Sequence, residues 1–158
     1  MPMVFIPIAE ETGHIVQLGE WVIRSALMEA ARWQKHLCVS VNLSPVQMRS
    51  ANLLPTVINA LAASGVDASR LELEITETVL MHDTQANLGV LQQLRALGSR
   101  IALYDFGTGY SSLNYLRSFP FDKIKIDRCF VDEVDSRDDS RAIVRAVTGL
   151  ATTLGMVT

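Results

Sequence analysis

Five polar or charged side chains stand in or just beyond apolar runs of this sequence. In chain order they are Asn42, Glu74, Glu77, Asp105 and Lys125. Because the carboxyl ends of parallel strands lie along one edge of an α/β sheet, such residues converge although they are far apart in sequence. Amide and carboxylate oxygens are ligands that Mg²⁺ and Mn²⁺ prefer, and a lysine can orient a water or offset phosphate charge. The set predicts metal-assisted cleavage of a phosphodiester.

The segment after Asp105 adds a second signal. Residues 105–114 read DFGTGYSSLN, so that Gly107, Thr108 and Gly109 follow a strand end directly. Glycines permit unusual backbone angles, and such loops hold metal and phosphate in α/β proteins. Asp-Phe-Gly also occurs in kinases, but no VAIK-type lysine or HRD segment accompanies it, and a P-loop would need a Gly-Lys-Ser/Thr ending. Neither of those classes is therefore indicated.

Structural roles compete with this hypothesis for any single residue. Polar side chains at strand ends often only bond loop backbone. Glu72 is predicted to be a solvated or helix-facing salt-bridge partner rather than a ligand. Trp21 and Trp33 are predicted to pack in the core. The site hypothesis therefore depends on the set of residues together.

Alternating strands and helices would position these residues. The apolar patterns predict strands at 37–43, 71–77, 100–104 and 123–126, and helices at 16–34, 53–63, 84–97 and 141–154. Ser44 and Pro45 should open a further short helix, Ser140 should cap the last helix, and residues 156–158 should begin a fifth strand. This βα series predicts an α/β fold with a parallel sheet and right-handed crossovers.

Two architectures satisfy that pattern, a doubly wound sheet and part of a (β/α)8 TIM-type barrel. A closed barrel normally takes about 250 residues. The chain has 158 residues. The barrel therefore requires a partial domain of about four to five βα units.

Composition limits the classes of function. A chain of 158 residues with 49% apolar content is expected to form one globular domain. Its net charge of -3 disfavours binding to DNA or RNA. Cys38 and Cys129 match neither a disulfide framework nor a metal pattern, which favours the cytoplasm. No apolar stretch reaches the roughly 20 residues that span a bilayer, so no membrane contact is expected within the chain.

Five ordered motifs in this sequence resemble the EAL domain family. They are residues 5–13 (FIPIAEETG), 41–45 (VNLSP), 72–77 (ELEITE), 105–113 (DFGTGYSSL) and 123–127 (KIKID). The resemblance implies a (β/α)8-type barrel that hydrolyses the bacterial second messenger cyclic di-GMP to a linear dinucleotide. Residues 1–158 would form a single partial domain of this kind.

The resemblance also implies a role for each candidate residue. Asn42, Glu74 and Asp105 would be ligands of Mg²⁺ or Mn²⁺. Asp105 and Lys125 would be catalytic, by activating the attacking water and stabilising developing charge. Glu77 would anchor the glycine-rich loop, which in the family couples dimerisation and substrate binding to activity.

Departures from the family pattern bear on activity. No Glu-Ala-Leu occurs in the sequence, and the chain stops before the family's Ala-Glu-Gly-Val-Glu strand, so truncation at both ends is expected. The family's paired Asp-Asp before Phe-Gly-Thr-Gly is here Tyr104-Asp105. A tyrosine with a pKa of about 10 is neutral at pH 7 and cannot replace a carboxylate that bridges two divalent ions. Tyr104 is predicted to fill the vacated ion site, with loss of metal binding.

These observations predict a cyclic di-GMP signalling domain that descends from a phosphodiesterase and is inactive or very weak as this chain. The alternative is a non-catalytic cyclic di-GMP receptor, or a dimerisation and protein-interaction module. The unpaired strand edges and uncovered interior of a partial barrel predict a homo-oligomer.

Overall fold

Four parallel strands form the centre of the molecule. The computed structural model describes residues 2–81, 84–106, 119 and 121–158. The strands, which form one sheet in chain order, are β1 (Val39–Asn42), β2 (Leu71–Thr76), β3 (Arg100–Phe106) and β4 (Lys123–Ile126). All three neighbouring pairs are parallel. The predicted α/β class and parallel sheet are therefore confirmed.

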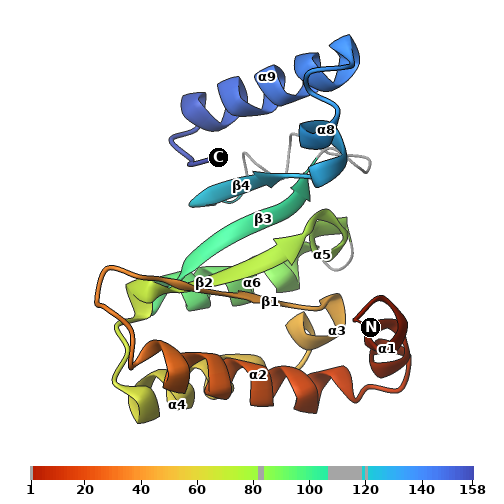
Figure 1. Ribbon diagram of the computed structural model, residues 1–158. Helices are drawn as coiled ribbons and strands as arrows, with labels where there is room; N and C mark the ends of the chain where they lie inside the picture. The colour runs from red at the N-terminus through yellow and green to blue at the C-terminus, as the bar shows by residue number, and fades with distance from the viewer. Residues whose placement is uncertain (1, 82–83, 107–118, 120) are drawn as a thin grey trace.

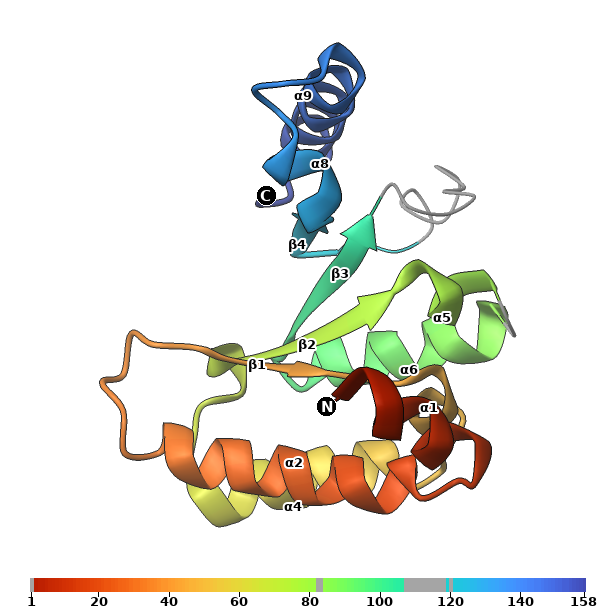
Figure 2. The ribbon, with the colours of Figure 1, turned by 45° about the vertical axis from the view of Figure 1, so that its right-hand side comes forward.

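Helices precede, connect and follow the strands. They are α1 (Pro2–Glu11), α2 (Ile15–Ala30), α3 (Pro45–Met48), α4 (Leu53–Ser64), the 3-10 helix η1 (Ala68–Arg70), α5 (Glu77–Met81), α6 (Thr84–Ala96), α8 (Arg128–Asp132) and α9 (Asp138–Thr153). Helices α2 and α4 run side by side below β1, and α9 lies at the β4 end of the sheet (Figure 1). The view in Figure 2 shows the strands turning progressively from β1 to β4, as the twist of parallel strands requires.

The two faces of the sheet differ in chemistry because successive side chains of a strand point to opposite sides. One face carries the buried apolar residues Val41, Leu73, Ile101 and Ile124, which belong to one hydrophobic cluster with α2, α4, α6 and α9. The opposite face carries the polar residues of the same strands. We call it the polar face, and its described members include Ser40, Asn42, Glu72, Glu74, Ala102, Tyr104, Lys123 and Lys125.

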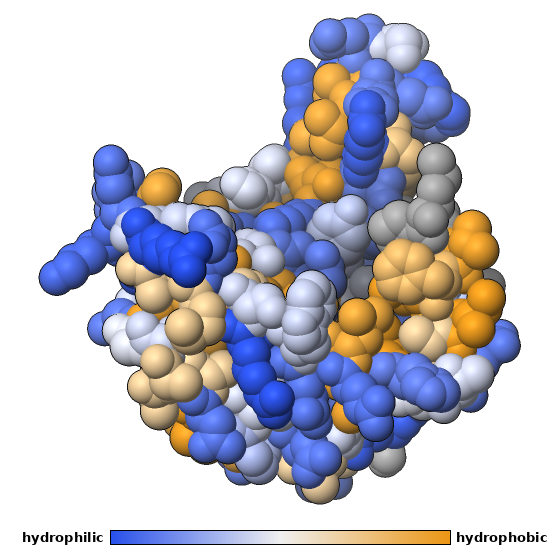
Figure 3. Space-filling model, turned by 60° about the horizontal axis from the view of Figure 1, so that its bottom comes forward, coloured by the Kyte–Doolittle hydropathy of each residue, from blue (hydrophilic) through white to orange (hydrophobic). Residues whose placement is uncertain are grey.

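Helix α2 is buried along a stripe that corrects the sequence prediction. Its buried residues are Ile15, Gly19, Ile23, Leu27 and Ala30. Trp21 lies about 200° around the helix from Ile23 and is 64% exposed, and Trp33, beyond the helix end, is 38% exposed. The prediction that both tryptophans pack in the core is therefore wrong. In the view of Figure 3, patches of hydrophobic surface lie between hydrophilic side chains.

The C-terminal segment bears on two expectations. Val157 pairs in parallel with Lys123, and the Ile124 N–H donates to the Val157 carbonyl at 2.8 Å. Val157 therefore forms an isolated bridge beside β4, where residues 156–158 were predicted to begin a strand. Helix α9 starts at Asp138 with Arg137 as its N-cap, so Ser140 lies inside the first turn and does not cap the helix.

Candidate functional site

The turn after β1 fixes the position of Asn42. This residue ends β1 and is paired in register with Glu74 of β2. Ser44 caps α3 through a capping box, in which the Ser44 N–H donates to Gln47 Oε1 at 3.1 Å. Gln47 in turn lies against Gly19 of α2, where a Cβ atom would stand 1.8 Å from Gln47 Nε2. A glycine at position 19 therefore lets α2 support the turn that carries Asn42.

Lysines of β4 and glutamates of β2 form an ion-paired cluster on the polar face. Lys125 Nζ contacts Glu74 Oε1 and lies 3.3 Å from Glu72 Oε1. Lys123 Nζ lies 2.5 Å from Glu72 Oε2. The hydroxyl of Ser40 donates to Glu72 Oε1 at 2.9 Å. We call these five residues the lysine-glutamate cluster.

Glu72 is more buried than the sequence suggested. It is a salt-bridge partner, as predicted, but its side chain is 3% exposed and lies on the face opposite the helices. The prediction of a solvated or helix-facing position is therefore wrong. The reason is that the long lysine side chains of β4 fold over it, which the sequence of β2 alone does not reveal.

The charges of the cluster support one another. Burial alone would lower the pKa of Lys125, but its hydrogen bond with Glu74 and the charges of Glu74 and Glu72 raise that pKa overall. Burial alone would raise the pKa of Glu72, but hydrogen bonds from Lys123 and Ser40 and the lysine charges lower it overall. Both groups are therefore ionised at neutral pH, and each carboxylate is neutralised by a lysine.

Strand β3 ends in a bulge at the predicted loop start. Its pairing with β4 shifts register between Leu103 and Phe106, and Asp105 has a left-handed backbone with φ 56°. A non-glycine residue in this conformation is uncommon, although aspartate tolerates it better than most. Bulges next to functional sites redirect a side chain. The strand extends to Phe106, two residues past the predicted end, and the bulge lies at Tyr104 and Asp105.

Three ionisable groups meet where β3 and β4 end. Burial, with the hydrogen bond and charge of Asp127, raises the pKa of Asp105. The charge of Asp105, with burial and a hydrogen bond to that carboxylate, raises the pKa of Tyr104 above the ordinary 10.0. Asp127 caps α8 by accepting from the Cys129 N–H at 2.7 Å, and its pKa is lowered by its hydrogen bonds with Cys129. The Tyr104 phenol is therefore neutral at pH 7.

Glu77 and the glycine-rich loop complete the set of predicted residues. Glu77 begins α5 directly after β2 and is buried. Gly107, Thr108 and Gly109 lie outside the described residues. The proposed anchoring of this loop by Glu77 stays a prediction.

Two interactions near the site were not expected from the sequence. Glu10 at the end of α1 accepts a hydrogen bond from the Ser44 hydroxyl at 2.6 Å, which joins α1 to the turn after Asn42. The sequence motifs indicated no role for Lys123. Its spacing of two from Lys125 nevertheless places both side chains on the same face of β4. That alternation was the available signal for Lys123.

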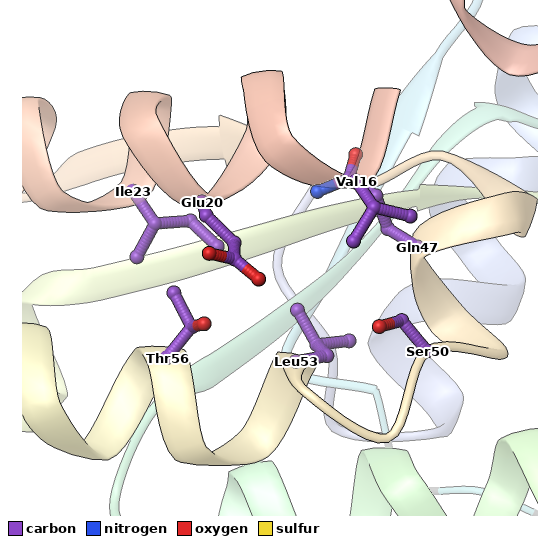
Figure 4. A pocket seen from close by; sticks show the side chains of 7 residues that line it. All are labelled: Val16, Glu20, Ile23, Gln47, Ser50, Leu53 and Thr56. Atoms are coloured by element: carbon purple, nitrogen blue, oxygen red, sulfur yellow. The ribbon is translucent and has the colours of Figure 1, made fainter. Parts of the chain in front are cut away.

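Two cavities among the described residues lie away from the predicted site residues. Figure 4 shows one of about 10 Å³, lined by residues of α2, of α4 and of the segment between Asn42 and α4. It has room for no more than about one water molecule. A groove of about 320 Å³ between α2 and α4 is lined by Arg24, Met28, Asn59, Ala60 and Ala63. Neither cavity includes a predicted site residue.

Two searches of the described residues were negative. They contain no group of three or more His, Cys, Asp or Glu residues placed to hold a metal ion. They also contain no helix that is long and apolar enough to cross a membrane. The cytoplasmic location expected from the cysteines stays a prediction.

Parallel strands with connecting helices, and polar residues gathered toward the strand ends, are typical of (β/α) barrel domains. Residues 1–158 match the EAL domain family over their whole length. The chain belongs to the EAL domain family, as its motifs suggested.

Relatives in bacteria match nearly the whole chain. It is 53% identical over 157 residues to the uncharacterized protein y4lL of Sinorhizobium fredii, covering 99% of this chain and 19% of that protein. It is 43% identical over 159 residues to the bifunctional diguanylate cyclase/cyclic di-GMP phosphodiesterase MucR of Pseudomonas aeruginosa, covering 98% of this chain and 23% of that protein. The chain thus spans about a fifth of the length of these relatives.

Solved structures of the family share the fold. The PaMucR phosphodiesterase in complex with c-di-GMP matches with a TM-score of 0.94 and 42% identity, covering 99% of this chain and 66% of that one. The manganese/cy-diGMP complex of Klebsiella pneumoniae BlrP1 matches with a TM-score of 0.78 and 29% identity, covering 90% of this chain and 36% of that one. A calcium complex of BlrP1 is also similar, with a TM-score of 0.81.

Proposed function

We propose that this chain is an EAL domain that binds cyclic di-GMP and whose hydrolytic activity is impaired or lost. The observation that carries the proposal is Tyr104, which stands beside Asp105 where the family has a second aspartate. Relatives over nearly the whole chain are named as cyclic di-GMP phosphodiesterases, and similar solved structures contain the dinucleotide.

Binding is supported by the charges at the carboxyl ends of the strands. Cyclic di-GMP carries two phosphodiester anions, and Lys125 can offset one of them. The side chain of Lys125 is 30% exposed, so that its ammonium can be reached from solvent. Asn42 is exposed at the end of β1 and offers both a donor and an acceptor.

The donor set fits a pair of divalent cations poorly. Tyr104 supplies a neutral phenol where a bridging carboxylate is needed. One of the two carboxylate oxygens of Glu74 is already bound to Lys125. The BlrP1 complexes contain calcium or manganese, but metal ligation by Asn42, Glu74 and Asp105 stays a proposal for this chain. These features support a binding role more strongly than a catalytic one.

Calorimetric titration of cyclic di-GMP with and without Mg²⁺, combined with chromatography of the linear product, tests the proposal. We expect the unchanged chain to bind without appreciable turnover. Tyr104→Asp should make binding depend on Mg²⁺ and raise turnover by about 10- to 100-fold, the typical effect of a group that supports a metal. Tyr104→Phe is the matched control, since it retains the ring and adds no carboxylate.

Each experimental result leads to a different conclusion. Turnover by the unchanged chain at the level of Tyr104→Asp would refute the loss of activity. Absence of binding by all three proteins would refute the binding role and leave a protein-interaction role.

One observation favours the protein-interaction role. Val4, Phe5 and Ile8 of α1 are 63%, 47% and 56% exposed, and clustered apolar surface favours contact with another protein chain. We propose a homo-oligomer, for which light scattering should give a mass above 17.4 kDa. A monomer at all concentrations would contradict it.

A further inference from the structure

We propose that Glu72 is a positioning residue that holds the Lys125 ammonium at the carboxyl edge of the sheet and so sets the affinity for cyclic di-GMP. The affinity part of this inference rests on the proposed function, whereas the positioning part does not. From the sequence, Glu72 was expected to be a solvated or helix-facing salt-bridge partner.

Position in the sheet gives Glu72 this role. Strand β3 lies between β2 and β4, so the two charged strands are roughly 9–10 Å apart, twice the strand spacing. The side chains of Glu72 and Lys125 must therefore meet above β3. They can do so because Ala102, paired in register with both Glu74 and Lys123, presents only a methyl group there. Ala102 is 0% exposed, as expected if the charged side chains cover it.

The two oxygens of Glu72 have different partners. Oε2 lies 2.5 Å from Lys123. Oε1 accepts from Ser40 at 2.9 Å and lies 3.3 Å from Lys125. Ser40 orients the Oε1 atom that faces Lys125, in a carboxylate that is 3% exposed. That oxygen restricts Lys125 from one side while Glu74 restricts it from the other. A lysine held in this way loses less side-chain entropy when it binds an anion.

A charge argument makes the opposite prediction, which allows a sharp test. If Glu72 acted only through the electrostatic field of its carboxylate, Glu72→Gln would remove one negative charge from the polar face. The binding of an anionic ligand would then become tighter. If Glu72 positions Lys125, the same substitution should weaken binding, by about tenfold. Lys123→Gln is the matched control, since it removes the same 2.5 Å ion pair and leaves the Glu72 contact with Lys125.

The experiment compares the unchanged chain, Glu72→Gln and Lys123→Gln by calorimetric titration with cyclic di-GMP at two salt concentrations. In parallel, the side-chain ammonium of Lys125 is followed in ¹H–¹⁵N spectra without ligand, with its signal assigned by its absence in Lys125→Arg. We expect Glu72→Gln to weaken binding about tenfold and to shift and broaden the Lys125 signal. Lys123→Gln should change the affinity by less than about threefold and leave the Lys125 signal sharp.

The outcomes separate this inference from the proposed function. Unchanged or tighter binding by Glu72→Gln, with an unchanged Lys125 signal, would overturn the inference while the proposed function stands. Equal losses of affinity in Glu72→Gln and Lys123→Gln would show that the lysine-glutamate cluster has only a structural role. That result would also overturn the inference. If the unchanged chain does not bind cyclic di-GMP, the proposed function fails, and the Lys125 spectrum alone decides whether Glu72 positions that ammonium.

Discussion

The two faces of the sheet are made from alternate residues of the same strands, and they are stabilised in different ways. On one face, Leu73 and Ile101 are fully buried against helices. On the polar face, Glu72 and Glu74 are nearly as buried, but lysines rather than helices cover them. The apolar face gains stability in proportion to the surface removed from water. The polar face gains less, because burial of each charge opposes the attraction of its partner.

This difference separates stability from function within single strands. Leu73 lies between Glu72 and Glu74 in sequence, but its side chain points to the opposite side of β2. A substitution at Leu73 should therefore act on the fold, and one at Glu72 on the site. The predictions below test that separation, from the largest expected effect to the smallest.

The largest effect is expected on the apolar face. Ile101→Ala should lower the free energy of unfolding by about 2–5 kcal/mol, because it removes buried methyl groups and leaves a cavity. Ile58→Ala on α4 is the matched control, since Ile58 is 42% exposed, and should cost less than about 1 kcal/mol. Urea unfolding followed by circular dichroism measures both. Equal losses would show that the helix-covered face is not the main source of stability.

An intermediate effect is expected at Ala102 on the polar face. Ala102→Leu should destabilise the chain by about 1–3 kcal/mol, because a larger side chain would occupy the space above β3 in which the charged side chains meet. It should also shift the ammonium signal of Lys125. Ala102→Ser, which adds a single oxygen atom, should change the free energy of unfolding and the Lys125 signal less. A leucine variant with unchanged stability and an unchanged Lys125 signal would contradict the proposed crossing above Ala102.

The apolar face was largely predictable from the sequence. Period-two alternation in β2, and the apolar character of all four strands, located every strand in the described residues to within a few positions. The short helix after Ser44 followed from serine and proline chemistry at a helix start. The error at Trp21 arose because two stripes of α2 are apolar, and only packing against β1 and α4 selects the one through Ile23.

The polar face was predictable as a set of residues but not as a set of contacts. Placement of polar groups at the carboxyl edge follows from parallel topology. The pairing of Lys125 with Glu72 does not, because β2 and β4 are not neighbours and their contact depends on the small side chain of Ala102. The left-handed backbone of Asp105 was equally hidden, since its sequence context is compatible with an ordinary strand end. Contacts across an intervening strand and local backbone geometry require the folded structure.

The smallest effect is expected in the acid dependence of stability, and it isolates Glu72. The folded-state pKa of Glu72 lies below its ordinary value of 4.5, so the folded chain binds fewer protons at this site than the unfolded chain. The contribution of Glu72 is therefore fully present above pH 4.5 and is lost as the pH falls through the lower folded value. The unfolding free energies of the unchanged chain and Glu72→Gln should therefore converge below pH 4.5. Parallel curves for Glu72→Gln would mean that its carboxylate is solvated in solution, and the polar face would then owe its order to the backbone rather than to its ion pairs.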